Sequence, residues 1–164
     1  MDVLVTERNN KPKIILFNEQ KLNIDDLMDS PETGTRYFGY IGGIKNYPEG
    51  YIVLKWGLHR RLHSGFGCLH IWLQHQNCFK TQKICENVED VPALVARVLR
   101  PGTRILEQHR GDDRLAVLQS SIGTIILEWR SGYYSIVTLY LKKDTRGTVI
   151  GSVRSLPEIN ILDK

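Results

Sequence analysis

Cysteine is scarce in this sequence, and its spacing supports no disulfide framework. The three cysteines, Cys68, Cys78 and Cys85, are an odd number and form no CxxC pair. This pattern indicates a reducing compartment. No base is recognisably paired with Cys68 or Cys85, so we expect both thiols to be inert.

Long apolar runs are also lacking. No stretch approaches the roughly 18 consecutive apolar residues that a membrane-spanning helix needs. Residues 1–13 lack the basic region and the long apolar stretch that mark a secretory signal. We therefore expect a protein that acts in the cytoplasm and makes no contact with a membrane.

The charge is modest but unevenly placed. The 164 residues are 41% hydrophobic and 24% charged, which is ordinary for one soluble domain. Residues 1–49 hold six Lys/Arg against eight Asp/Glu, whereas residues 50–164 hold sixteen against ten. The basic part is typical of a protein with a polyanionic partner, although an ordinary solvated surface has the same excess.

Residues 1–50 contain short β-prone runs at 13–17 and 33–43, with a short helix or turn at 23–29 between them. We interpret residues 1–50 as an N-terminal extension within the same domain. Residues 51–164 then form the main α+β domain, beginning with the apolar, β-prone run at 51–56.

Two helices are predicted. Residues 67–76 place Leu69, Trp72 and Leu73 on one side of a helix, with His70 and His75 on opposite flanks of that stripe. Residues 91–100 carry apolar side chains at the i, i+3, i+4, i+7 spacing of a second helix, which Pro101-Gly102 ends.

From residue 103 the pattern changes to strands. Five β-prone runs (103–109, 114–120, 123–130, 133–143 and 148–154) are joined by short turns, which predicts a four- to five-stranded antiparallel meander and an α+β fold. Alternation in the fourth run puts Val137, Leu139 and Leu141 on one face, and Tyr134, Ile136, Thr138 and Tyr140 on the other. The second face suits a phosphate-containing ligand, but a sheet with one wet face shows the same alternation.

The run GFGCLHIWLQH (65–75), the helix after it and the arginine-bearing meander, whose late strand reads SIVTLY (135–140), resemble a known superfamily. It is the barnase-EndoU-colicin-RelE superfamily of ribonuclease toxins, and in particular its phage-associated and contact-dependent-inhibition branches. The resemblance covers roughly residues 55–145. Members commonly have Arg-His-Gly at the end of the histidine helix, where this chain has Gln74-His75-Gln76.

The resemblance implies an endoribonuclease that needs no metal or other cofactor and cuts RNA, with tRNA as one candidate target. The 2′-hydroxyl attacks its own phosphate and leaves a 2′,3′-cyclic end. His70 is then the base, His75 or a group on the sheet is the acid, and Arg104 and Thr138 assist at the phosphate. Such a toxin can have a cognate immunity or antitoxin protein and can be delivered as the C-terminal part of a secreted protein.

Further residues are candidates for RNA binding because of their charge or aromatic character. Arginine can form two hydrogen bonds to one phosphate, and tyrosine can stack on bases. The predicted RNA-binding residues are Arg60, Arg61, Arg114, Arg130, Tyr134 and Tyr140.

Two other interpretations stay open. His59 and His63 have the i, i+4 spacing of zinc ligands, with cysteines nearby, but Arg60 stands where a zinc-protease motif has glutamate. A basic, aromatic sheet could also bind nucleic acid, or another protein, without any catalysis. Individually, His59, His63 and His109 are also interpretable as surface histidines.

Overall fold

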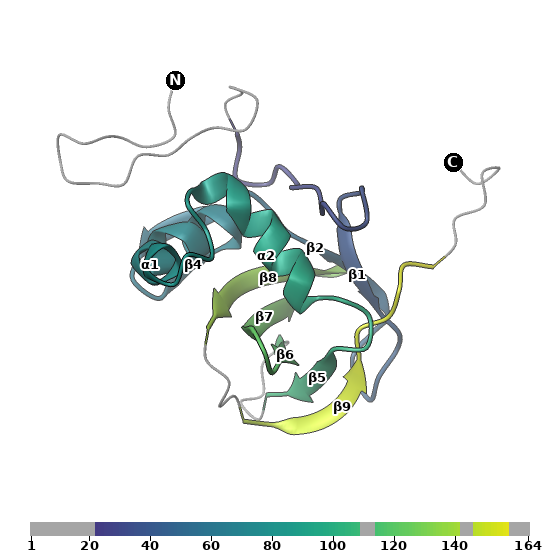
Figure 1. Ribbon diagram of the computed structural model, residues 1–164. Coiled ribbons are helices and arrows are strands. Elements are labelled where there is room, and N and C mark those ends of the chain that lie inside the picture. Colours follow the sequence, from purple (N-terminus) through teal and green to yellow (C-terminus); the bar gives the residue numbers. More distant parts are fainter. Residues whose placement is uncertain (1–21, 109–113, 142–145, 158–164) are drawn as a thin grey trace, which may run out of the picture.

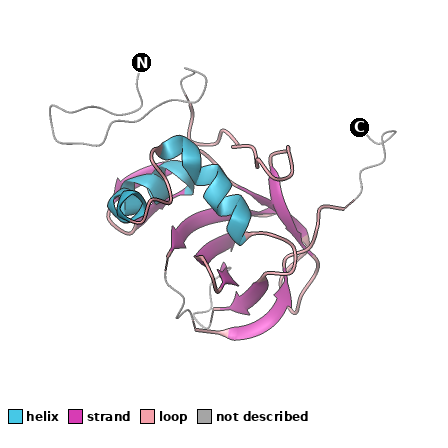
Figure 2. Cartoon of the chain, in the orientation of Figure 1, coloured by secondary structure: helices cyan, strands magenta, loops and turns pink. Residues whose placement is uncertain are grey.

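The computed structural model describes residues 22–108, 114–141 and 146–157, and these residues form an α+β fold (Figures 1 and 2). A mixed seven-stranded sheet has the order β1-β2-β8-β7-β6-β5-β9, and β3 and β4 form a separate two-stranded sheet. The strands are β1 (Tyr37–Ile41), β2 (Gly50–Val53), β3 (Leu58–Arg61), β4 (Ser64–Phe66), β5 (Arg104–Glu107), β6 (Arg114–Gln119), β7 (Gly123–Trp129), β8 (Tyr133–Tyr140) and β9 (Thr148–Ser152). The strand expected at 13–17 and the histidine at 109 lie outside the described residues.

The predicted meander is confirmed for strands β5 to β8, which pair antiparallel in chain order. The fifth run forms β9, but it pairs with β5 at the far edge and not with β8. The sheet is mixed because β2 lies parallel to β8 on that strand's other side. The alternation along single strands could not reveal either pairing, since both join segments far apart in the chain.

Helices α1 (Gly67–Thr81) and α2 (Val91–Val98) are confirmed, with α1 one turn longer than expected. In Figure 1, α2 lies in front of the sheet and α1 lies at its side, next to β4. A short 3-10 helix, η3 (Val88–Asp90), immediately precedes α2, and Asn87 caps its N-terminus. Trp56 and Trp72 are buried in the same core as α2, as the apolar pattern predicts.

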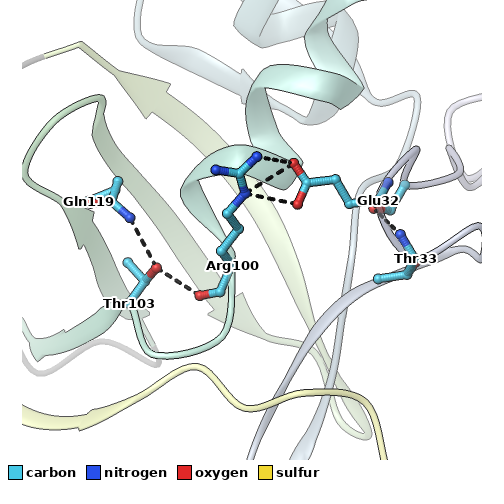
Figure 3. Close-up of polar contacts among 6 residues, drawn as sticks. Glu32, Thr33, Arg100, Thr103 and Gln119 are labelled. Atoms are coloured by element: carbon cyan, nitrogen blue, oxygen red, sulfur yellow. Dashed lines mark hydrogen bonds and ion pairs between the residues drawn. The ribbon is translucent and has the colours of Figure 1, made fainter.

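An ion pair joins the N-terminal segment to the end of α2 (Figure 3). The guanidinium of Arg100 donates to both carboxylate oxygens of Glu32, at 2.9 to 3.2 Å. The Thr103 hydroxyl donates to the Arg100 carbonyl oxygen at 2.7 Å. Both charged groups are partly exposed, so we expect the pair to orient the 30–36 turn more than to stabilise the fold.

A β-bulge in β8 changes which of its side chains face the core. Thr138 lies opposite Ile126, but Ile136 lies opposite Leu127, so one extra residue, Val137, is inserted. Tyr134 and Ile136 therefore face the core, whereas Thr138 and Tyr140 keep the opposite face. Simple alternation placed all four on one face, and that prediction is wrong for Tyr134 and Ile136.

The second half of β8 has a different neighbour from the first half. β2 pairs only with Tyr133 to Ser135, and beyond that point α1 and β4 pack beside β8. The face of β8 that carries Thr138 is thus brought next to the histidines of residues 59–75. This junction between sheet, hairpin and helix forms the candidate site.

Candidate active site

Two histidines from different elements meet at the start of α1. Nδ1 of His59, in β3, lies 2.9 Å from Nδ1 of His70, in α1, and the ring centroids are 5.1 Å apart. One of the two nitrogens must carry the proton and the other must accept it. This pair could not be predicted from the sequence, because the two residues are eleven positions apart and in elements of different type.

The hairpin that carries His59 approaches α1 closely because of Gly65. This residue has φ of +148°, and a Cβ atom built on it would lie 2.7 Å from Nδ1 of His70. A side chain at this position would therefore push His70 away from His59. The glycines of the 65–67 run are needed for this close approach of the backbone to the imidazole.

Burial keeps the imidazole of His70 neutral. Only 2% of the residue is exposed, and this desolvation lowers its pKa to about 4, with His59, His75 and His63 nearby adding to the effect. Burial also lowers the pKa of His59. Near pH 7 both rings are thus uncharged, and His70 is able to accept a proton.

His70 and Thr138 line one cavity, as predicted. The cavity has a volume of about 320 Å³ and is also lined by Arg60, His63 and Arg114. Thr138 is 4% exposed, and its buried Oγ1 makes no hydrogen bond to the described residues. A buried hydroxyl without a partner costs free energy, which a ligand oxygen in this cavity would recover.

The two arginines that line the cavity come from different elements of the fold. Arg60 is in the hairpin, while Arg114 begins β6 and donates to Glu128 at 3.0 Å. Glu128 also accepts from Arg130 at 3.0 Å, so two guanidinium groups share one carboxylate. Such an arrangement holds the arginines in place and leaves net positive charge beside the cavity.

Arg104 does not belong to this site, which corrects the prediction that it shares a cleft with His70 and Thr138. It lies in β5, opposite Leu118, and is three strand spacings from Tyr140 in β8, with β6 and β7 between them. At about 4.8 Å per strand this is roughly 14 Å. Arg114 is the strand arginine that lines the cavity, and the sequence could not distinguish the two without the strand order.

Four other predicted site residues differ in their surroundings. Tyr134 is fully buried and its hydroxyl donates to the Pro48 carbonyl oxygen, so it cannot stack on RNA, which corrects that assignment. His75 packs against Tyr140, with ring centroids 5.5 Å apart, but does not line the cavity. Tyr140 does line it, whereas Arg61 is exposed on the hairpin outside it.

His63 is exposed and is the second histidine that lines the cavity. Its backbone has φ of +62°, and its N–H donates to Oε1 of Gln74 at 2.7 Å. Gln74 also lies 3.5 Å from His63 Nδ1. Gln74 thus positions His63, a role that could not be predicted from the sequence.

Cys68 and Cys85 are buried, and burial raises the pKa of both thiols, that of Cys85 to about 12, which agrees with their expected inertness. Among the described residues, no three His, Cys, Asp or Glu side chains converge as metal ligands. In the same part of the chain, no helix is long and apolar enough to cross a membrane.

In comparisons with known proteins, no family model, no curated protein and no solved structure matches the chain.

The low pKa of His70 predicts that acid destabilises the fold. In the unfolded chain His70 binds a proton near the ordinary value of 6.5, but in the folded protein only near pH 4. Between these values the unfolded state binds more protons, so lowering the pH favours unfolding. The shift corresponds to about 3 kcal/mol of stability, present above pH 6.5 and lost by pH 4.

Urea denaturation at pH 7 and pH 4 measures this loss. Because carboxylates also titrate in the range, the comparison is with His70→Gln, whose free energy of unfolding should fall by about 3 kcal/mol less than that of the wild type. Equal losses in the two proteins would show that His70 is not held neutral by the fold.

Proposed function

We propose that the protein is an endoribonuclease that needs no metal, with the His70 cavity as its active site. The observation that carries the proposal is the convergence of a buried neutral histidine, an unpartnered hydroxyl and two arginines on one cavity. These are the groups that phosphodiester transesterification requires: a base, a hydrogen-bonding group and cations for the phosphate charge. The motif resemblance supports the same chemistry.

His70 acts as the base in one tautomer only. When His70 Nδ1–H donates to Nδ1 of His59, Nε2 of His70 is unprotonated and free to take the proton of the 2′-hydroxyl. His59 then remains an acceptor and stabilises the imidazolium that forms. In the opposite tautomer His70 Nε2 already carries a proton and cannot act as a base.

The other groups act on the phosphate and the leaving group. Arg60 and Arg114 bind the phosphate oxygens and stabilise the charge that develops on them, while the Thr138 hydroxyl donates to one of these oxygens. His63, the exposed histidine that lines the cavity, is the one best placed to protonate the leaving 5′-oxygen. The 2′-oxygen–phosphorus bond forms as the phosphorus–5′-oxygen bond breaks, leaving a 2′,3′-cyclic phosphate and a free 5′-hydroxyl.

Incubation with total tRNA, with and without EDTA, tests the proposal. We expect cleavage at an equal rate in both, with 2′,3′-cyclic phosphate ends and no cleavage of strands in which 2′-O-methyl groups replace the nucleophile. Loss of cleavage in EDTA and its recovery with zinc would instead indicate a metal site. Retention of all RNA preparations without cleavage would indicate a binding protein.

A further inference from the structure

A second cleft lies on the same face of the sheet, on the other side of the β-bulge. It has a volume of about 540 Å³, and three tyrosines line it: Tyr37 from β1, Tyr51 from β2 and Tyr133 from β8. Arg36 and Lys55 also line it, together with Asp25. Neither the motif resemblance nor the proposed catalytic chemistry gives this aromatic cleft a role.

The tyrosines are arranged as a stacking surface. The rings of Tyr37 and Tyr51 are 4.3 Å apart at the centroids, with an interplanar angle of 28°. Tyr133 lies directly opposite Tyr51 in the β2–β8 pairing. All three are partly exposed, although a folded chain usually buries rings of this size. Partly exposed, stacked aromatic rings are suited to binding a flat group on their open face.

The charge around the tyrosines suits an anionic ligand. Lys55 Nζ lies 5.2 Å from the centroid of the Tyr133 ring and 3.2 Å from a carboxylate oxygen of Asp25. Arg36 is exposed at the edge of the cleft and leaves one positive charge in excess over Asp25. Aromatic rings beside cations are the usual surface for single-stranded nucleic acid, whose bases stack while its phosphates bind the cations.

Shared lining residues connect this cleft to the active site. A smaller cavity of about 120 Å³ lies between the two, and Lys55 lines both it and the tyrosine cleft. The same small cavity shares Phe66 and Arg114 with the His70 cavity. Lys55, Arg130 and Arg114 all line this small cavity, where their three positive charges exceed the single negative charge of Glu128. A strand of RNA could lie along this path with its phosphates on these cations.

We propose that the cleft of Tyr37, Tyr51 and Tyr133 binds an unpaired base of the RNA that is cut at His70. The inference rests on the proposed function and deepens it, because it defines the substrate as single-stranded on one side of the cut. Tyr133 precedes Thr138 by five positions in β8, which is roughly 15 Å along the strand. A dinucleotide at His70 is too short to reach the tyrosines, and several unpaired nucleotides are needed.

Binding of a 2′-O-methyl RNA 12-mer of mixed sequence, followed by fluorescence anisotropy, tests the cleft separately from catalysis. Tyr37→Leu and Tyr133→Leu should each raise the Kd by roughly 5- to 150-fold, since each removes a stacking ring. Tyr37→Trp and Tyr133→Phe retain the ring and serve as matched controls, with Kd values close to that of the wild type. Circular dichroism verifies that each variant is folded.

The same variants should bind a blunt RNA duplex as well as the wild type does, because paired bases cannot enter the cleft. If the leucine variants bind the single-stranded 12-mer with unchanged Kd, the base site is overturned. If they weaken its binding but wild-type protein cuts no RNA, the base site stands and the proposed endoribonuclease activity is refuted. The two hypotheses therefore fail on different measurements.

Discussion

Replacement of His70 by alanine is expected to slow RNA cleavage by about 10²- to 10⁴-fold, the usual contribution of a positioned acid or base. The side chain lines the cavity and is held neutral by its burial, so the variant loses the group that accepts the 2′-hydroxyl proton. Binding of the uncleavable 12-mer should remain within a few-fold of wild type, since a neutral imidazole contributes little to phosphate binding. Single-turnover cleavage and anisotropy measure the two effects separately.

His75→Ala is the matched control on the same helix. His75 packs on Tyr140 and Phe79 and does not line the cavity, so its loss should slow cleavage less than about tenfold. A loss as large as that of His70→Ala would restore His75 as the acid. A small loss for His70→Ala itself would refute the assignment of the base.

His59 gives a finer test of the mechanism. Its Nδ1 accepts the proton of His70 in the productive tautomer, so His59→Ala should slow cleavage and His59→Gln, whose amide oxygen can also accept, should partly restore it. Since the pKa of His70 is about 4 in the wild-type protein, protonation of this base should lower kcat/KM only as the pH approaches 4.

The parts of the fold that could be predicted from sequence are those set by local periodicity. Both helices and the four-stranded meander follow from apolar spacing and turn residues, and His70 and Thr138 follow from the motif resemblance. The bulge at Val137 could not be predicted, because an inserted residue changes the facing of Tyr134 without any change in composition.

The parts of the site that were missed depend on long-range pairing. His59 contacts His70 only because the β3–β4 hairpin folds back on the start of α1. The tyrosine cleft exists only because β2 joins β8 in parallel, across eighty residues of chain. Neither contact leaves a repeating pattern in the sequence. The glycines at 65 and 67 are visible in the sequence, but the close approach of the hairpin to His70 that Gly65 allows is not.

Arg114 should contribute to both RNA binding and catalysis, whereas Arg104 should contribute to neither. Arg114 lines the His70 cavity and the small cavity beside it, so its guanidinium can bind the phosphate at the cut and stabilise the charge of the transition state. Loss of such a group typically slows the reaction by about 10²- to 10³-fold. Arg114→Ala should show this loss in kcat/KM and should also weaken binding of the uncleavable 12-mer.

Arg104→Ala is the matched control, because Arg104 is an exposed strand arginine on β5, roughly 14 Å of strand spacing from β8. It should retain a cleavage rate within a few-fold of wild type. A salt series separates the two further: removal of a phosphate-binding cation lowers the slope of log Kd against log salt by about one. We expect that change for Arg114→Ala and not for Arg104→Ala. If Arg104→Ala gives the larger loss in both measurements, RNA crosses the sheet towards β5, and the path along Lys55 and Arg130 is refuted.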